Sequence, residues 1–129
     1  MASIDRITAL LNNQFSDGRL KLPAKANPTK DYPLKGILLW YTNADIDNSI
    51  IALGRKTQIG LYSQGVQIAI LHTSYDKSRE IAFKVMEYLN VNMPTGIVMR
   101  PEGSPTYSGI NDERGQHVYV INYLMKGDK

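Results

Sequence analysis

Residues 65–90, GVQIAILHTSYDKSREIAFKVMEYLN, constrain the fold more than any other part of the chain. Residues 66–71 are apolar at nearly every position, which predicts a strand in the centre of a sheet. A short polar turn follows, in which Thr73 or Ser74 can cap a helix. The helix after the turn carries an apolar stripe at helical spacing, which predicts that it packs against the sheet. The members of this stripe are Tyr75, Ser78, Ile81, Ala82, Val85, Met86 and Leu89.

Shorter signals predict further elements on both sides of this unit. Apolar residues recur at helical spacing in residues 3–14, whereas residues 42–49 and 101–116 are rich in turn formers and are expected to be loops. Strands are expected at residues 36–41, near 57–63, at 96–100 and at 117–125. The chain therefore predicts an α+β fold, with one mixed or mainly antiparallel sheet of about four to five strands packed against two helices.

Length and composition are those of one ordinary domain. A chain of 129 residues buries roughly two-thirds of its unfolded surface, so it needs no covalent staple. It contains no cysteine, which excludes disulfides, thiolate metal sites and a cysteine nucleophile. No apolar run approaches membrane-spanning length, and the first residues lack the basic start and apolar centre of a signal peptide. We therefore expect a single domain, residues 1–129, without a membrane span.

The positive charge of the chain is concentrated in residues 19–35. This segment has five basic residues and one acidic residue, Asp31, so it carries more than the whole net charge of +3. Its basic residues are Arg19, Lys21, Lys25, Lys30 and Lys35. Its three prolines stand five residues apart and predict an extended arm or loop rather than a helix or a central strand. The arm is either a solvated loop or a contact surface for a polyanion or an acidic partner.

The turn after residue 71 lacks the residues that most catalytic turns need. A phosphate-cradling loop needs glycines and a lysine, but this turn reads HTSY. His72, Ser74 and Asp76 are close in sequence, yet no nucleophile-elbow pattern surrounds the serine. His72 and His117 each stand at the end of a predicted strand, without a third ligand at motif spacing. The sequence therefore predicts no catalytic, cofactor or metal site.

Three segments of the chain resemble small bacteriophage minor capsid and tail-completion proteins, among them the tail terminators of long-tailed phages. Residues 65–90 are similar to the strand-to-helix unit of that family, with its Ser/Asp-type turn. The segment NDERGQHVYVINYLMKG resembles its acidic-Gly turn and final strand, with Tyr119, Asn122 and Tyr123 at the aromatic-Asn-aromatic positions. The segment SIDRITALLNNQF is similar to its first helix, and the three segments together cover about half of the chain.

The resemblance implies an α+β structural protein of the virion, located in the neck region of the tail. Such a protein would form a homo-oligomeric ring, commonly a hexamer, that caps the tail tube, stops its elongation and forms the interface to the head. Its partners would be the tail tube protein and a head-completion or connector protein. DNA would pass through the ring without sequence-specific binding. The resemblance implies no enzymatic activity, cofactor or metal.

We expect the contacts of such an assembly in the basic arm and beside it, with residues 101–116 as a second candidate arm. The candidate contact residues are Arg19, Lys21, Lys25, Lys30, Lys35 and Trp40. For Trp40 the alternative is ordinary packing in the core. Other functions stay open: a head-side connector, or a small cytosolic module that binds an acidic or nucleic-acid partner through the same arm. An enzyme that uses His72, Ser74 or His117 is the remaining alternative.

Overall fold

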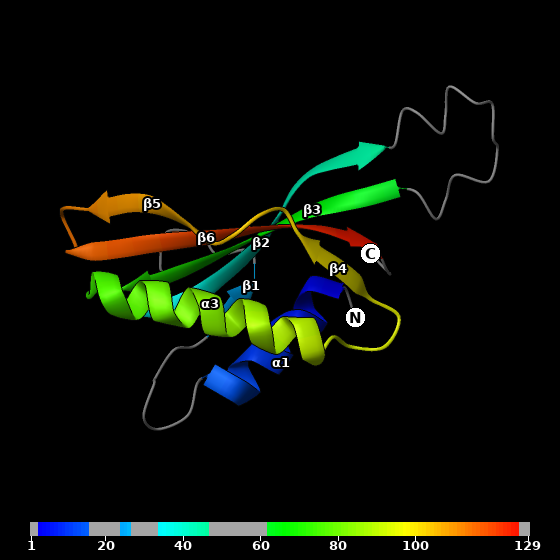
Figure 1. The fold of residues 1–129 in the computed structure, drawn as a ribbon, viewed down its shortest axis with the longest axis horizontal. Helices are drawn as coiled ribbons and strands as arrows, with labels where there is room; N and C mark the ends of the chain where they lie inside the picture. Colours follow the sequence, from blue (N-terminus) through cyan, green and yellow to red (C-terminus); the bar gives the residue numbers. More distant parts are fainter. Residues whose placement is uncertain (1–2, 16–23, 27–33, 47–61, 127–129) are drawn as a thin grey trace.

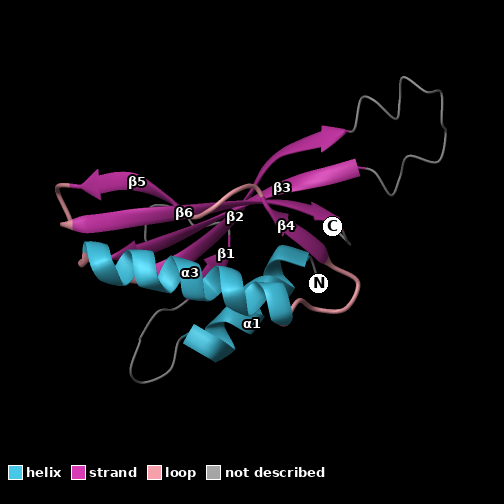
Figure 2. Ribbon diagram, viewed as in Figure 1, coloured by secondary structure: helices cyan, strands magenta, loops and turns pink. Residues whose placement is uncertain are grey.

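The computed structural model describes residues 3–15, 24–26, 34–46 and 62–126 (Figures 1 and 2). The described elements are α1 (Ser3–Phe15), β1 (Ala24–Ala26), β2 (Gly36–Ile46), β3 (Tyr62–His72), α3 (Tyr75–Val91), β4 (Val98–Pro101), β5 (Thr106–Asn111) and β6 (Gln116–Lys126). The strands form one six-stranded sheet in the order β1-β2-β3-β6-β4, and β5 also pairs with β6. β1 is parallel to β2, whereas the other pairs are antiparallel. This confirms the predicted α+β fold with a mixed sheet, which is slightly larger than expected.

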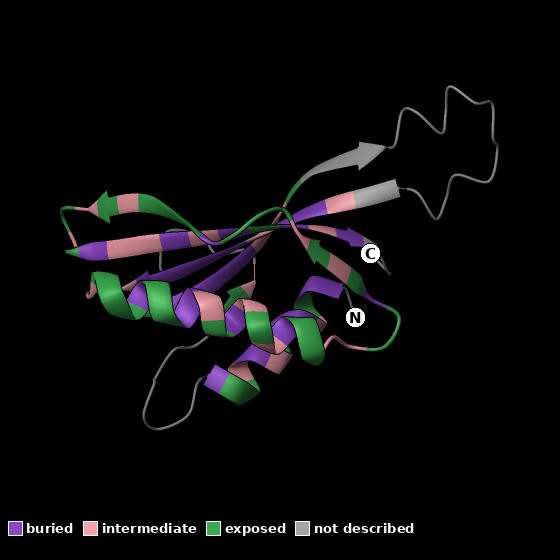
Figure 3. Ribbon diagram, viewed as in Figure 1, coloured by how far each residue is buried: buried purple, intermediate pink, exposed green. Residues whose placement is uncertain are grey.

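Both described helices lie on one face of the sheet, so the described residues form two layers (Figure 1). α3 packs against β3 and β6, and α1 packs against β1 and β2. The core lies between the layers and includes Ile7 and Leu11 of α1, Leu39 of β2, Ile68 of β3, Val85 of α3 and Ile121 of β6 (Figure 3). Burial of each such side chain stabilises the fold by roughly 1.5–3 kcal/mol. We call this side of the sheet the helix face and the opposite side the open face.

β3 is the central strand that the apolar run predicts. It pairs with β2 along one edge and with β6 along the other, so that Ile68 lies between Leu39 and Ile121. These three residues point to the helix face and are fully buried. The next residue, Ala69, points to the open face, because successive side chains of a strand alternate. The run is apolar on both faces of the sheet, and this explains why it shows no alternation of apolar and polar residues.

The turn after β3 caps α3 as predicted. Ser74 is the N-cap, and its side chain accepts a 3.4 Å hydrogen bond from the backbone N–H of Lys77. At the other end, the backbone N–H of Asn92 donates to the carbonyl of Tyr88. Five members of the predicted stripe are buried, namely Ser78, Ile81, Ala82, Val85 and Leu89. The prediction was wrong for Tyr75, which is 42% exposed because it is the first residue of the helix and lies outside the core.

The prediction of a loop from residue 42 was wrong, because β2 continues through Ile46. The register of β2 against β3 shifts between Tyr41 and Ala44, which marks a β-bulge or irregularity. Beyond the shift, Ala44 lies opposite Gln64 and Ile46 lies opposite Tyr62. Cross-strand pairing therefore overrides the turn preference of the local residues. Of the strand expected near residues 57–63, only residues 62 and 63 are described, and they belong to β3.

The prediction of one loop over residues 101–116 was also wrong, because this segment contains β5. β4 and β5 pair with different parts of the same edge of β6: β4 with residues 123–126 and β5 with residues 116–120. Between them, the backbone N–H of Glu102 donates a 2.7 Å hydrogen bond to the carbonyl of Asn122. The two strands therefore form one interrupted edge. The turn formers around β5 resemble a loop locally, but the long partner strand supplies the pairing that orders it.

Part of the basic arm is an edge strand. β1 covers Ala24–Ala26 and is tied to α1 by Asn12, whose side chain accepts from the Ala24 N–H at 2.6 Å and donates to the Ala24 carbonyl at 2.9 Å. This agrees with the prediction that the arm contains no helix and no central strand among its described residues. Residues 19–23 and 27–33 lie outside the described part of the chain.

Candidate assembly surface

The turn between β3 and α3 is held by its own polar groups. The backbone N–H of Ser74 donates a 3.0 Å hydrogen bond to Nδ1 of His72, and the Ser74 side chain caps the helix. Burial lowers the pKa of His72, and the positive charges of Lys35 and Lys77 lower it further. The imidazole is therefore kept in the neutral form that can accept this hydrogen bond. These contacts give His72 and Ser74 a role in the turn itself.

The two histidines lie opposite each other in the sheet, with His72 of β3 paired to His117 of β6. The Nδ1 atom of His117 lies 2.9 Å from the hydroxyl of Tyr107, so the imidazole ring is hydrogen-bonded to strand β5. Among the described residues, no group of three histidine or carboxylate side chains is arranged to hold a metal ion. Sequence reasoning had no signal for the Tyr107 contact, because it depends on the unpredicted strand β5.

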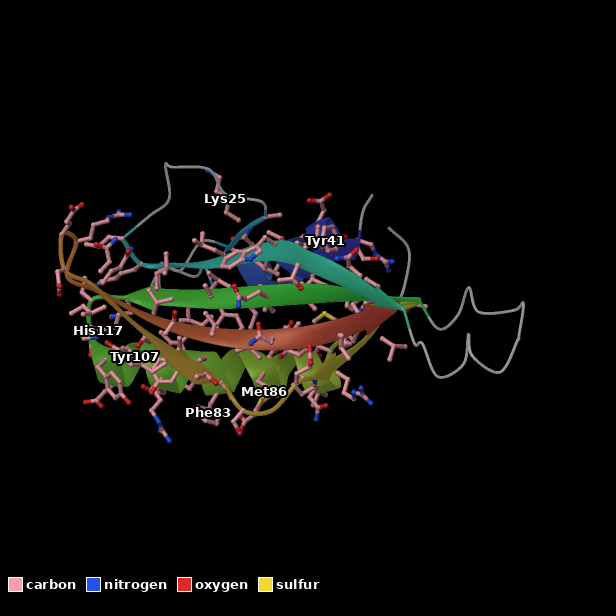
Figure 4. The ribbon with its side chains drawn as sticks, turned by 90° about the horizontal axis from the view of Figure 1, so that it is seen from above. Lys25, Tyr41, Phe83, Met86, Tyr107 and His117 are labelled. Atoms are coloured by element: carbon pink, nitrogen blue, oxygen red, sulfur yellow. The ribbon has the colours of Figure 1, made fainter. Side chains whose placement is uncertain are left out.

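An aromatic cluster surrounds His117 at the end of the sheet where α3 begins (Figure 4). It consists of Tyr75, Tyr107, His117 and Tyr119, with ring centroids between neighbours 5.0–6.0 Å apart. The hydroxyl of Tyr119 donates a 2.7 Å hydrogen bond to the hydroxyl of Tyr75, and this bond raises the pKa of Tyr119. Tyr107 is 37% exposed and Ile110 beside it is also exposed. Rigid, partly exposed tyrosines of this kind are typical anchors of protein–protein contacts.

The open face carries an apolar patch that no described helix or strand covers (Figure 4). The patch consists of Leu38 and Trp40 of β2, Ala69 and Leu71 of β3, and Val118 and Val120 of β6. A hydrogen bond of 2.9 Å between the side chains of Gln67 and Asn122 borders it. Leu38, Ala69 and Leu71 are buried at the centre of this patch, whereas Trp40, Val118 and Val120 are only partly buried. The last three are therefore the apolar side chains that the open face offers for a contact.

The structure places three of the six candidate contact residues. Trp40 is half-buried and belongs to the open-face patch, so it lies outside the helix-covered core. Lys25 is exposed and lies opposite Leu38 in the register, which puts it at the edge of the same face. Lys35 is exposed just before β2, where it lowers the pKa of His72. The others, Arg19, Lys21 and Lys30, lie outside the described residues.

A second cation lies at the opposite edge of the open face. Arg100 of β4 is exposed and lies opposite Leu124 in the register, on the face that Asn122 and Val120 share. Positive charge therefore lies at both edges of the open face: Lys25 on β1, beside Leu38 of the patch, and Arg100 on β4, beyond the Gln67–Asn122 border of the patch. Sequence reasoning found Lys25 and missed Arg100, because the position of β4 in the sheet depends on its pairing with β6.

No protein-family model matches the chain, and no curated protein matches it at a significant level. Among the described residues, no helix combines the length and apolarity needed to cross a bilayer.

Proposed function

We propose that this protein is a structural component of a bacteriophage virion that forms a ring on the finished tail tube. The ring stops elongation of the tube and forms the interface to the head. The observation that carries the proposal is the open face, where Trp40, Val118 and Val120 are partly exposed around a buried apolar centre, and Lys25 and Arg100 lie at the edges of the sheet. The resemblance of the strand-to-helix unit and the final strand supports the same assignment.

A closed ring needs two different patches on each subunit, which meet in a heterologous contact. The open face is one such patch. The aromatic cluster, with Tyr75, Tyr107 and the neighbouring Ile110, is on the helix face at one end of the sheet and offers the second. An interface of standard size buries roughly 800 Å² on each partner. Trp40 and its apolar neighbours would lie at the centre of such an interface as its anchor.

The basic residues have a separate role in this proposal. Lys25 and Lys35 belong to the segment with the highest positive charge, and both are exposed. They would contact the acidic surface of a tube or connector protein, or line the channel through which DNA passes. A contact of that kind needs charge rather than base recognition, so it would not depend on the DNA sequence.

The test is electron microscopy of virus particles produced after disruption of the gene. Separate DNA-filled heads, together with tails of abnormal or uncontrolled length, support the tail-terminator function. Particles with tails of normal length but emptied heads assign the protein to the head-side connector instead. Unchanged particles contradict a role in the virion and favour the binding module, which salt-sensitive binding to unrelated DNA sequences would then identify.

A further inference from the structure

Two histidines face each other at the end of the sheet where α3 begins (Figure 4). His72 of β3 is paired with His117 of β6, and the neighbouring pair on the same face, Ile70 and Tyr119, belongs to the buried core. Because side chains alternate along a strand, both imidazoles lie on the helix face. The Cβ atoms of directly opposed residues in an antiparallel pair are about 5 Å apart. A charge on one imidazole therefore acts on the other at short range.

The two rings use Nδ1 in contacts that respond differently to a proton. Nδ1 of His72 accepts a 3.0 Å hydrogen bond from the backbone N–H of Ser74. A backbone N–H can only donate, so this bond requires an unprotonated Nδ1 and is lost in the imidazolium form. Nδ1 of His117 lies 2.9 Å from the hydroxyl of Tyr107, and a hydroxyl can either donate or accept. The contact of His117 therefore survives protonation, whereas the contact of His72 does not.

The charges that act on His72 come from both sides of the ring and are positive. Lys35 directly precedes β2, in line with His72 in the register of β2 against β3, and Lys77 lies in the first turn of α3. Burial lowers the pKa of His72, and the two lysines lower it further. The carboxylate of Asp76, in the same turn of α3, is not among the groups that shift this pKa. The imidazole is therefore neutral at pH 7 and charged only in acid.

The neighbours of His117 on β5 and α3 are aromatic rings. The ring centroids of Tyr107 and Tyr75 each lie 6.0 Å from that of His117. Tyrosine rings supply no negative charge near neutral pH, so they do not compensate a proton on His117. Protonation of His117 therefore adds a third positive charge beside His72, on the same face of the sheet. The two histidines resist simultaneous protonation, and their titrations are coupled.

The hydrogen bond of Ser74 connects His72 to the aromatic cluster. Ser74 caps α3, and the next residue, Tyr75, accepts from the hydroxyl of Tyr119 and packs against the ring of Tyr107, with centroids 5.0 Å apart. Loss of the bond to His72 would loosen the first turn of α3, on which the position of Tyr75 depends. We propose that the His72–His117 pair is a pH-sensitive switch, which holds the aromatic cluster together when neutral and loosens it when protonated. This inference concerns the single chain and does not depend on the proposed ring.

The test is an NMR titration of the full chain between about pH 8 and about pH 5, the range in which histidines change charge. The amide proton signal of Ser74 should move upfield as its hydrogen bond is lost. The ring signals of Tyr75 should move toward those of free tyrosine, with the same midpoint as the ring proton of His72. The control is the ring pair Phe15 and Tyr88, near the other end of α3, which should not titrate. A Ser74 signal that stays constant would overturn the inference.

Two variants separate the histidines, because a proton on His117 can also move the signals of Tyr75 directly. In His117→Asn this direct effect is absent, so the signals of Tyr75 should still follow His72, with a higher midpoint because an opposing charge is removed. In His72→Asn the side-chain oxygen can still accept from Ser74 but does not titrate, so the Ser74 signal should stay constant. Tyr75 signals that no longer titrate in His117→Asn, or a Ser74 signal that still titrates in His72→Asn, would contradict the switch.

Discussion

The hydroxyl of Tyr119 donates a 2.7 Å hydrogen bond to the hydroxyl of Tyr75, which joins strand β6 to the first residue of α3. Farther along β6, Tyr123 has a buried hydroxyl without a partner among the described residues. The hydroxyl of Tyr119 thus stabilises the fold through a hydrogen bond. The hydroxyl of Tyr123 destabilises it, because no hydrogen bond compensates for its removal from water. This contrast leads to the first prediction.

Tyr123→Phe should raise the free energy of unfolding by about 1 kcal/mol, because it removes a buried donor that gains no hydrogen bond in the folded chain. Tyr119→Phe should lower it, because the bond to Tyr75 is lost. Urea unfolding followed by the fluorescence of Trp40, the single tryptophan, measures both variants. A destabilised Tyr123→Phe variant would show that this hydroxyl has a favourable partner in solution.

Ser74→Ala should destabilise the fold by about 1 kcal/mol, because the N-cap of α3 loses the side chain that accepts from Lys77. Ser104→Ala is the matched control. Ser104 is exposed between β4 and β5, and the hydrogen bond that involves it uses its carbonyl. Thermal unfolding followed by circular dichroism should show a lower Tm for Ser74→Ala and no change for the control. Equal Tm values for the two variants would show that the Ser74 side chain does not stabilise α3 as an N-cap.

The lowered pKa of His72 predicts a weak dependence of stability on pH. The ordinary pKa of a histidine is 6.5, and the pKa of His72 in the folded chain lies below it because of burial and because of Lys35 and Lys77. The unfolded chain therefore binds the proton first as the pH falls. This contribution to stability is complete above pH 6.5, decreases as the pH falls toward the folded pKa, and is constant below it. Denaturation at several pH values should show this decrease, and His72→Asn should abolish it.

The pKa of His72 itself is measurable by NMR titration of its ring proton. The midpoint should lie below 6.5, and Lys77→Gln should raise it, since the variant removes one of the two positive charges while the capping N–H of the backbone stays in place. Lys84→Gln, on the same helix but not among the causes of the shift, is the control. If Lys77→Gln leaves the midpoint unchanged, the charge of Lys77 does not act on His72.

The parts of the fold that the sequence predicts well are those coded by local pattern. The run at residues 66–71, the capped helix α3 and the final strand β6 each have a periodicity or a boundary residue that can be recognised without knowledge of the rest. β5 and the extension of β2 beyond Tyr41 have no such local signal. Both exist because a long neighbouring strand pairs with them, and pairing over many residues of sequence is not visible in a short window.

The candidate surfaces also divide into residues with a local sequence signal and residues that come together only through long-range packing. Trp40 was identifiable as a candidate contact residue from its residue type, and Lys25 from the local charge. The pocket lined by Met86, Met99 and Tyr123 was not predictable, because these residues come from three elements that meet only after the sheet has formed. One indirect signal for the open face was present in β3. A strand that is apolar on both faces is expected to be buried on both, and Ala69 and Leu71 are buried on the face that the described helices do not cover.

Charge reversal in the basic arm should impair assembly while the domain stays folded. In the triple variant, which carries Lys21→Glu, Lys25→Glu and Lys30→Glu together, the attraction of the arm to an acidic partner or to DNA becomes repulsion. Lys84→Glu, on the exposed side of α3, is a control for a change of surface charge. Complementation of the disrupted gene, with circular dichroism of the purified variants, measures the two effects separately. Normal particles from the triple variant would show that the basic arm is not needed for assembly.

The open face should decide the oligomeric state. Trp40→Gln and Val120→Gln each place an amide in the apolar patch, where it would be desolvated without a partner on association. Both variants should shift the proposed ring toward monomers, as measured by native mass spectrometry and light scattering. Val91→Gln is the control, because Val91 is 79% exposed at the end of α3, on the helix-covered side of the molecule. Rings that persist in both open-face variants, with the fold intact, would show that subunits associate through another surface.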